Sequence, residues 1–123
     1  MESKLYVLCS DKLDPIYACV QGGHAVAEYM IDNHVELHDW ISDRNLKNCW
    51  TNNTIVYVYC NIQELIHLLS KECYIPFSEW REPDYNNEIT AIAIWNQDIA
   101  HRARCSKHIQ DYIDKLEIIK AGS

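Results

Sequence analysis

Gln21 and His24 are the residues whose types and spacing first suggest a binding site. They lie three residues apart in the segment 16–33, where apolar or small residues recur every three or four positions, so a helix would place both on one face. A carboxamide and an imidazole could exchange hydrogen bonds with a ligand there, although His24 could equally be a hydrogen-bonded packing residue. Gly22 and Gly23 cost a helix about 1 kcal/mol each against alanine, which indicates that a strand or a ligand approaches the backbone closely.

A second group of polar residues lies in the segment 81–87. The carboxylates of Glu82 and Asp84 could serve a site, or they could cap and close a hairpin beside the proline between them. Asn86 and Asn87 indicate a turn first, because asparagine tolerates left-handed backbone, and a pair that reads a nucleotide base second.

Four strands and three helices are expected to position these residues. The strands are expected at 4–9, 54–60, 75–80 and 89–95, and the helices at 16–33, at 61 to about 73 and after a cap at Ser106. Pro15 suits the first helical position, and Asn61 suits an N-cap. Alternating strands and helices predict parallel pairing, and the last two strands predict a hairpin. The expected fold class is α/β, with a mixed four-stranded sheet (β-α-β-α-β-β) flanked by helices.

The chain is expected to form a single domain over residues 1–123, with an irregular insert at 34–50 in which a short helix could form. An extra C-terminal helix is expected over 105–120. Its apolar stripe would pack inside the chain or, failing that, would form the contact of a homodimer or a higher homo-oligomer. The stripe is Ile109, Tyr112, Ile113, Leu116 and Ile119. The four tryptophans expected in the core or at an interface are Trp40, Trp50, Trp80 and Trp95.

Composition narrows the classes of partner. The formal net charge of −7 argues against extended nucleic-acid binding, and the basic cluster at 101–108 could be a solvated patch or a local anion contact. None of the six cysteines forms a Cys-x-x-Cys pair, so they are expected to be reduced, and no metal site or cofactor is expected. No apolar run approaches the ~18 residues needed to span a bilayer, and the N-terminus lacks a signal-peptide core. A cytoplasmic protein without a membrane partner is expected.

Over about residues 4–95 the chain resembles the type-2 peptidyl-tRNA hydrolases. The resemblance is carried by the first strand and by the motifs Tyr17-Ala18-x-Val20-Gln21-x-Gly23-His24-Ala25 and Phe77-x-x-Trp80-Arg81-Glu82-Pro83-Asp84-x-Asn86-Asn87-x-x-Thr90-Ala91-Ile92-Ala93. It is closest to a branch of short relatives, many carried by bacteriophages, with a similar Arg-Glu-Pro-Asp turn.

The resemblance implies a groove between the first helix and the turn that joins the last two strands, where the family receives the ester of peptidyl-tRNA. In the family a lysine and an aspartate are implicated in hydrolysis. The lysine position falls on Tyr17, and the aspartate position falls on Glu82 with Asp84 as its neighbour. The family's longer loop is shortened here to 83–88.

Ester hydrolysis needs a base that activates water and a donor for the developing oxyanion. Glu82 or Asp84 could be the base. The donor would have to be Lys12, Arg81 or one of the amides of residues 86 and 87. Loss of such a donor costs about 10²–10³ in rate. Tyr17 cannot replace the charge of a lysine, although it can stack on a base.

The sequence therefore favours a non-catalytic binding module that holds a nucleotide-like ligand. For a phage-encoded chain, the resemblance suggests sequestration of a host immune signalling nucleotide in the host cytoplasm. The alternative is a peptidyl-tRNA or aminoacyl-tRNA hydrolase that acts on the tRNA 3′ end with Glu82, Asp84 and Lys12. A protein–protein inhibitor that uses the tryptophans and the acidic surface is a third class. The expected ligand-binding residues are Tyr17, Gln21, His24, Arg81, Glu82, Asp84, Asn86 and Asn87.

Overall fold

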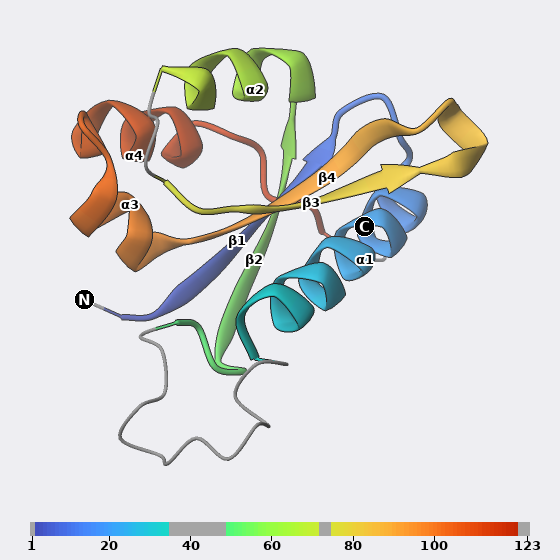
Figure 1. The fold of residues 1–123 in the computed structure, drawn as a ribbon. Helices are drawn as coiled ribbons and strands as arrows, with labels where there is room; N and C mark the ends of the chain where they lie inside the picture. Colours follow the sequence, from blue (N-terminus) through green and yellow to red (C-terminus); the bar gives the residue numbers. More distant parts are fainter. Residues whose placement is uncertain (1, 35–48, 72–74, 121–123) are drawn as a thin grey trace.

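The computed structural model describes residues 2–34, 49–71 and 75–120, and it confirms the expected mixed α/β fold (Figure 1). The four strands lie in the order β2-β1-β4-β3. The strands are β1 (Lys4–Ser10), β2 (Thr54–Cys60), β3 (Ser78–Glu82) and β4 (Glu88–Trp95). The helices are α1 (Pro15–His34), α2 (Ile62–Ser70), the 3₁₀ turn η3 (Pro83–Tyr85), α3 (Asn96–Arg102) and α4 (Ser106–Asp114).

The pairing of the strands follows the sequence pattern. β1 pairs with β2 in parallel, as the intervening helix predicts, and β3 and β4 form the expected antiparallel hairpin. β4 also pairs antiparallel with β1, so the apolar segment 89–95 is central in the sheet. β3 is an edge strand, and Pro76 lies just before it rather than within it.

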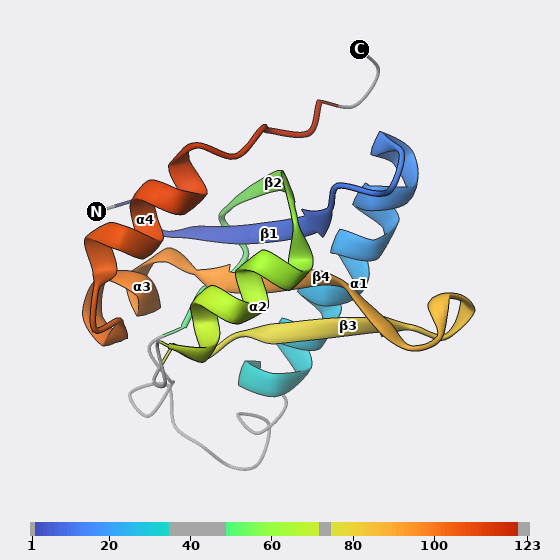
Figure 2. The ribbon, with the colours of Figure 1, turned by 90° about the horizontal axis from the view of Figure 1, so that it is seen from above.

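Helices cover both faces of the sheet, with α1 on one side and α2 and α4 on the other (Figures 1 and 2). Alternate residues of each strand supply the two cores. Leu5, Val7 and Cys9 of β1 pack on the α1 side, whereas Tyr6 and Leu8 pack on the α2 and α4 side. No helix in the described ranges is both long and apolar enough to cross a membrane.

α1 approaches the sheet closely at one glycine. A Cβ atom on Gly22 would lie 2.7 Å from Cε1 of Tyr57 and 2.9 Å from Sγ of Cys9, whereas a Cβ atom on Gly23 would meet nothing within 4 Å. Close packing of α1 against β1 and β2 therefore requires a glycine at position 22, and the close approach is to strands rather than to a ligand. α1 begins at Pro15, as expected.

The structure corrects several expectations of secondary structure. The third strand is displaced from 75–80 to 78–82. Ser106 is the first residue of α4 rather than its cap, and Cys105 holds the N-cap position without a side-chain hydrogen bond. α3 was not expected, because it follows β4 directly and no side chain caps it. The helix considered within 34–50 lies almost wholly outside the described residues.

The expected C-terminal helix over 105–120 is also shorter than predicted, because α4 ends at Asp114. The segment that follows runs antiparallel to the outer edge of β2. The Tyr59 N–H donates to the carbonyl of Glu117, and the Ile119 N–H donates to the carbonyl of Tyr57, both at 2.9 Å. This β2 cover, residues 117–119, pairs with the edge of β2 that faces away from β1.

The part of the apolar stripe that α4 carries packs inside the chain. Ile109 and Ile113 are buried in the core on the α2 and α4 side, and Tyr112 packs against that core. The stripe is therefore covered within the chain and is not available as a contact between subunits. The homodimer or higher homo-oligomer stays a prediction.

Candidate functional site

Gln21 lies in a buried hydrogen-bonded contact between α1 and β4. Its side chain is 1% exposed, and its Oε1 atom accepts a hydrogen bond of 2.6 Å from the Thr90 hydroxyl. Both groups are buried, so each satisfies the other where water cannot reach. The carboxamide is therefore held in one orientation.

A β-bulge brings Thr90 to this contact. Trp80 pairs with Ala91 and Arg81 pairs with Ile89, so Thr90 is the extra residue on β4. Ala91 and Ala93 pack on the α1 side, so regular alternation would turn Thr90 to the opposite face. The bulge places Thr90 and Ala91 on the same side, where the Thr90 hydroxyl reaches α1.

Glu82 is held by several donors at the end of β3. Its Oε2 atom accepts a hydrogen bond of 3.0 Å from the indole N–H of Trp80, and its Oε1 atom accepts one of 3.4 Å from the backbone N–H of Asp84. The second bond caps η3, which is the hairpin-closing role considered from the sequence.

These contacts set the charge state of Glu82. The Trp80 hydrogen bond, with smaller contributions from the Asp84 amide, the Gln21 side chain and the charge of His24, lowers the pKa of Glu82, and burial opposes them. The carboxylate is therefore ionised at neutral pH.

The lowered pKa of Glu82 predicts a pH dependence of folding. A group whose pKa is lower in the folded state stabilises the fold above its unfolded value, here the usual 4.5, and loses that contribution as the pH falls through the folded value. We expect Glu82→Gln to lower the free energy of unfolding at pH 7 and to flatten its decline below about pH 4.5. Urea denaturation of both proteins between pH 7 and pH 3 measures this effect. If the free energies of unfolding of the two proteins changed in parallel from pH 7 to pH 3, the lowered pKa of Glu82 would be contradicted.

The space predicted between the Gln21–His24 face and the hairpin is occupied beside His24 by an aromatic ring. The ring of Trp80 stacks on that of His24, with centroids 4.3 Å apart and planes 18° apart. His24 is exposed on its other side. Because the same indole bonds Glu82, Trp80 links the two residues that the resemblance places on opposite walls of the groove.

Gln21, His24, Trp80, Glu82 and Thr90 form a cluster between α1 and the hairpin, and Tyr17 lies next to it. Its ring is 6.0 Å from that of Tyr85 in η3. Burial, followed by the neighbouring Glu82, Tyr85 and Asp84, raises the pKa of Tyr17, so its hydroxyl is neutral. A phenol has no cationic form, so the position on which the family's lysine falls supplies no positive charge to the nearby carboxylates.

Arg81, Asn86 and Asn87 do not join this cluster. Side chains alternate along β3, so Arg81 faces away from the side that Trp80 and Glu82 occupy. Its Nε atom lies 2.6 Å from a carboxylate oxygen of Glu79, and its Nη1 atom donates to the backbone carbonyl of Asn87 at 3.2 Å. Asn86 and Asn87 have φ values of 53° and 59°, the left-handed turn that asparagine favours.

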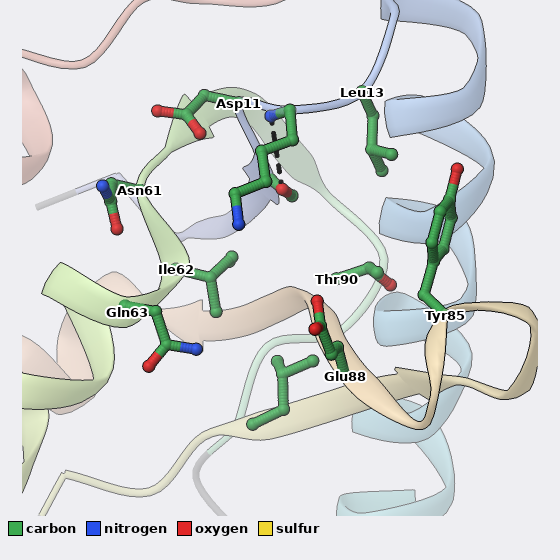
Figure 3. Close-up of a pocket in the computed structure, with 11 residues that line it drawn as sticks. Asp11, Leu13, Asn61, Ile62, Gln63, Tyr85, Glu88 and Thr90 are labelled. Atoms are coloured by element: carbon green, nitrogen blue, oxygen red, sulfur yellow. Dashed lines mark hydrogen bonds between the residues drawn. The ribbon is translucent and has the colours of Figure 1, made fainter.

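A pocket of about 230 Å³ lies beside the cluster, at the carboxyl ends of β1 and β2 (Figure 3). Figure 3 shows Asn61 and Gln63 on the α2 side of the pocket and Tyr85 and Glu88 on the hairpin side. The lining residues are Ser10, Asp11, Lys12, Leu13, Asn61, Ile62, Gln63, Tyr85, Glu88, Ile89 and Thr90.

Lys12 supplies the positive charge of the pocket. Its backbone N–H donates to the Ser10 hydroxyl at 3.3 Å, which shapes the turn after β1. Across the described residues, its ammonium forms no ion pair with Asp11, Glu88 or any other carboxylate. The charge is therefore available to an anionic ligand.

The sequence indicated Lys12 but missed Asn61, Gln63, Glu88 and Thr90 as lining residues. The signal that could have found them is the topology. The chain leaves β1 for α1 on one face and leaves β2 for α2 on the other, so a crevice is expected outside the carboxyl end of β1. Residues that follow the parallel strands are the natural candidates to line it.

The buried thiols contribute no nucleophile. Burial raises the pKa of Cys9 and of Cys60 to about 12, so both remain protonated in the core. Within residues 2–34, 49–71 and 75–120, the histidine, cysteine and acidic side chains form no group of three or more that could hold a metal ion.

Neither a protein-family model nor a curated protein matches this chain. The resemblance to type-2 peptidyl-tRNA hydrolases therefore rests on the motifs quoted above and remains an expectation.

Proposed function

We propose that the chain is a non-catalytic binding module whose pocket at the carboxyl ends of β1 and β2 holds a nucleotide-like ligand. The observation that carries the proposal is the set of groups around that pocket. Lys12 offers an ammonium to a phosphate, Tyr85 offers a ring face to a base, and Asn61 and Gln63 offer carboxamides to base edges or ribose hydroxyls.

The lowered pKa of Glu82, next to the pocket, supports binding without turnover. Glu82 accepts hydrogen bonds from Trp80 and from the Asp84 amide, and its lowered pKa makes it a weak base. The residue at the expected lysine position, Tyr17, is neutral. Under this proposal the cluster of α1 and the hairpin stabilises one wall of the pocket, and Thr90 belongs to both.

The biological role rests on the resemblance to short phage-borne relatives. A phage-encoded binding module of this kind would sequester a host immune signalling nucleotide in the host cytoplasm. Sequestration requires affinity alone, which agrees with a pocket that carries a cation and stacking and hydrogen-bonding groups.

Replacement of Lys12 tests the pocket directly. Isothermal titration with adenosine and guanosine 5′-monophosphate is expected to show binding that Lys12→Met weakens by about 10-fold to 100-fold, because a hydrogen bond to a charged group contributes about 1.5–3 kcal/mol. Lys107→Met is the matched control, since Lys107 lies on α4 in an exposed ion pair with Asp111. Absence of binding to both nucleotides, or equal affinity in Lys12→Met, would overturn the proposal.

One observation favours a second candidate, a peptidyl-tRNA hydrolase. Glu82 is ionised and lies at the end of β3, near His24 of α1, where the resemblance places the catalytic carboxylate. Release of the peptide from peptidyl-tRNA by the purified protein, abolished by Glu82→Gln and unaffected by Asp111→Asn on α4, would establish this candidate and exclude binding alone.

A further inference from the structure

A second recess adjoins the pocket on the α2 side of the hairpin. This recess, of about 330 Å³, shares Gln63, Glu88 and Ile89 with the pocket and reaches Arg81 at its far end. The two together form a groove that runs from Lys12, past Glu88, to Arg81.

The pocket and the recess together leave room for a ligand larger than the pocket alone can hold. Small-molecule sites typically enclose about 300–1,000 Å³. The pocket at Lys12, at about 230 Å³, lies below that range, and the pocket together with its recess lies within it. A ligand that fills both recesses extends past Glu88 to Arg81.

The groove carries charges of both signs. Lys12 and Arg81 are the cations at its ends, Asp11 lines it beside Lys12, and Glu88 lies between the cations with the carboxamide of Gln63. Arg81 is paired with Glu79, but both side chains are substantially exposed, at 57% and 36%, and such pairs are weak. A phosphate can replace Glu79 with two parallel hydrogen bonds from Nε and Nη2, while Nη1 keeps its bond to the Asn87 carbonyl. Glu88 repels phosphate and accepts hydrogen bonds, so the middle of the ligand must be uncharged and rich in donors.

We infer that the groove takes a dinucleotide, with one phosphate at Lys12, a nucleoside over Glu88 and the second phosphate at Arg81. This inference rests on the proposed function, and it names the ligand class of the same site. A long RNA strand fits less well, because the net charge of −7 opposes the neutralisation of many phosphates.

The test compares adenosine 5′-monophosphate with the 5′-phosphorylated dinucleotide pApA by isothermal titration. We expect pApA to bind at least 10-fold more tightly. Arg81→Met is expected to reduce the pApA affinity to that of the mononucleotide and to leave mononucleotide binding unchanged. Glu79→Gln, which removes the competing carboxylate, is expected to raise the pApA affinity by about 2-fold to 5-fold. Arg102→Met is the control, because Arg102 pairs with Asp98 on α3.

The outcomes separate this inference from the proposal beneath it. Equal affinity for the two probes in the native protein would overturn the dinucleotide assignment and leave the proposed function standing. An Arg81→Met variant that weakens both probes equally, or a Glu79→Gln variant that weakens pApA, would also overturn it. A longer oligoadenylate that binds more tightly than pApA, with a steep salt dependence, would identify a strand-binding protein instead. If neither nucleotide binds, the proposed function fails and the inference fails with it.

Discussion

Replacing Trp50 by alanine is expected to lower the free energy of unfolding by about 3–5 kcal/mol. Trp50 is 2% exposed and is the largest fully buried side chain among the described residues. Its indole N–H donates to the carbonyl of Thr54 at 3.1 Å, and its ring meets the edge of Tyr29, with centroids 6.2 Å apart. Alanine would leave a cavity under α1 and one carbonyl without its donor.

Urea denaturation at pH 7 measures the loss, and Trp50→Phe provides a graded control. Phenylalanine keeps an aromatic ring in the site and loses only the indole hydrogen bond and part of the volume, so its effect is expected to be smaller than that of alanine. A change below about 1 kcal/mol for Trp50→Ala would contradict the expectation for a core tryptophan.

Replacing Gly22 by valine is the second large effect, with an expected loss of about 3 kcal/mol, at the upper end of overpacking costs. The added Cβ atom alone would lie 2.7 Å from Cε1 of Tyr57 and 2.9 Å from Sγ of Cys9, and the two further methyl groups need still more space. α1 would have to move away from the sheet, which would also disturb the Gln21–Thr90 contact.

Gly23→Ala is the matched control for Gly22→Val. Nothing lies within 4 Å of a Cβ atom at Gly23, so alanine there is expected to stabilise the chain by up to about 1 kcal/mol through helix propensity. Thermal unfolding of the two variants beside the native protein measures the expected loss of stability and the expected gain in one experiment. Unchanged or increased stability of Gly22→Val would show that α1 does not depend on close approach at Gly22.

The regular elements were predictable because their signals are local. The apolar runs that became β1, β2 and β4 and the period of α1 set the fold class, and the cap at Asn61 was confirmed by its 3.1 Å bond from the Glu64 N–H. The glycine pair indicated a close approach but did not say to which residue, because Tyr57 lies more than thirty positions along the chain.

The parts that escaped prediction depend on tertiary contacts. α3 has no side-chain cap, and the segment after Asp114 leaves the helical pattern to pair with β2, which the periodicity of Leu116 and Ile119 does not reveal. The bulge at Thr90 has no residue signature, yet it decides which side chain meets Gln21. The sequence grouped Arg81 with Glu82, and the alternation of β3 separates them to opposite faces of the sheet.

The β2 cover has a consequence for synthesis of the protein. Ribosomes make residues 117–119 about sixty residues after the part of β2 that they pair with. At about 5–20 residues per second, the outer edge of β2 waits roughly 3–12 s for its partner. During that interval a nascent chain presents open strand hydrogen-bonding groups to its neighbours on the same message, so the risk of aggregation at this edge is concentrated in the time before residues 117–119 pair with β2.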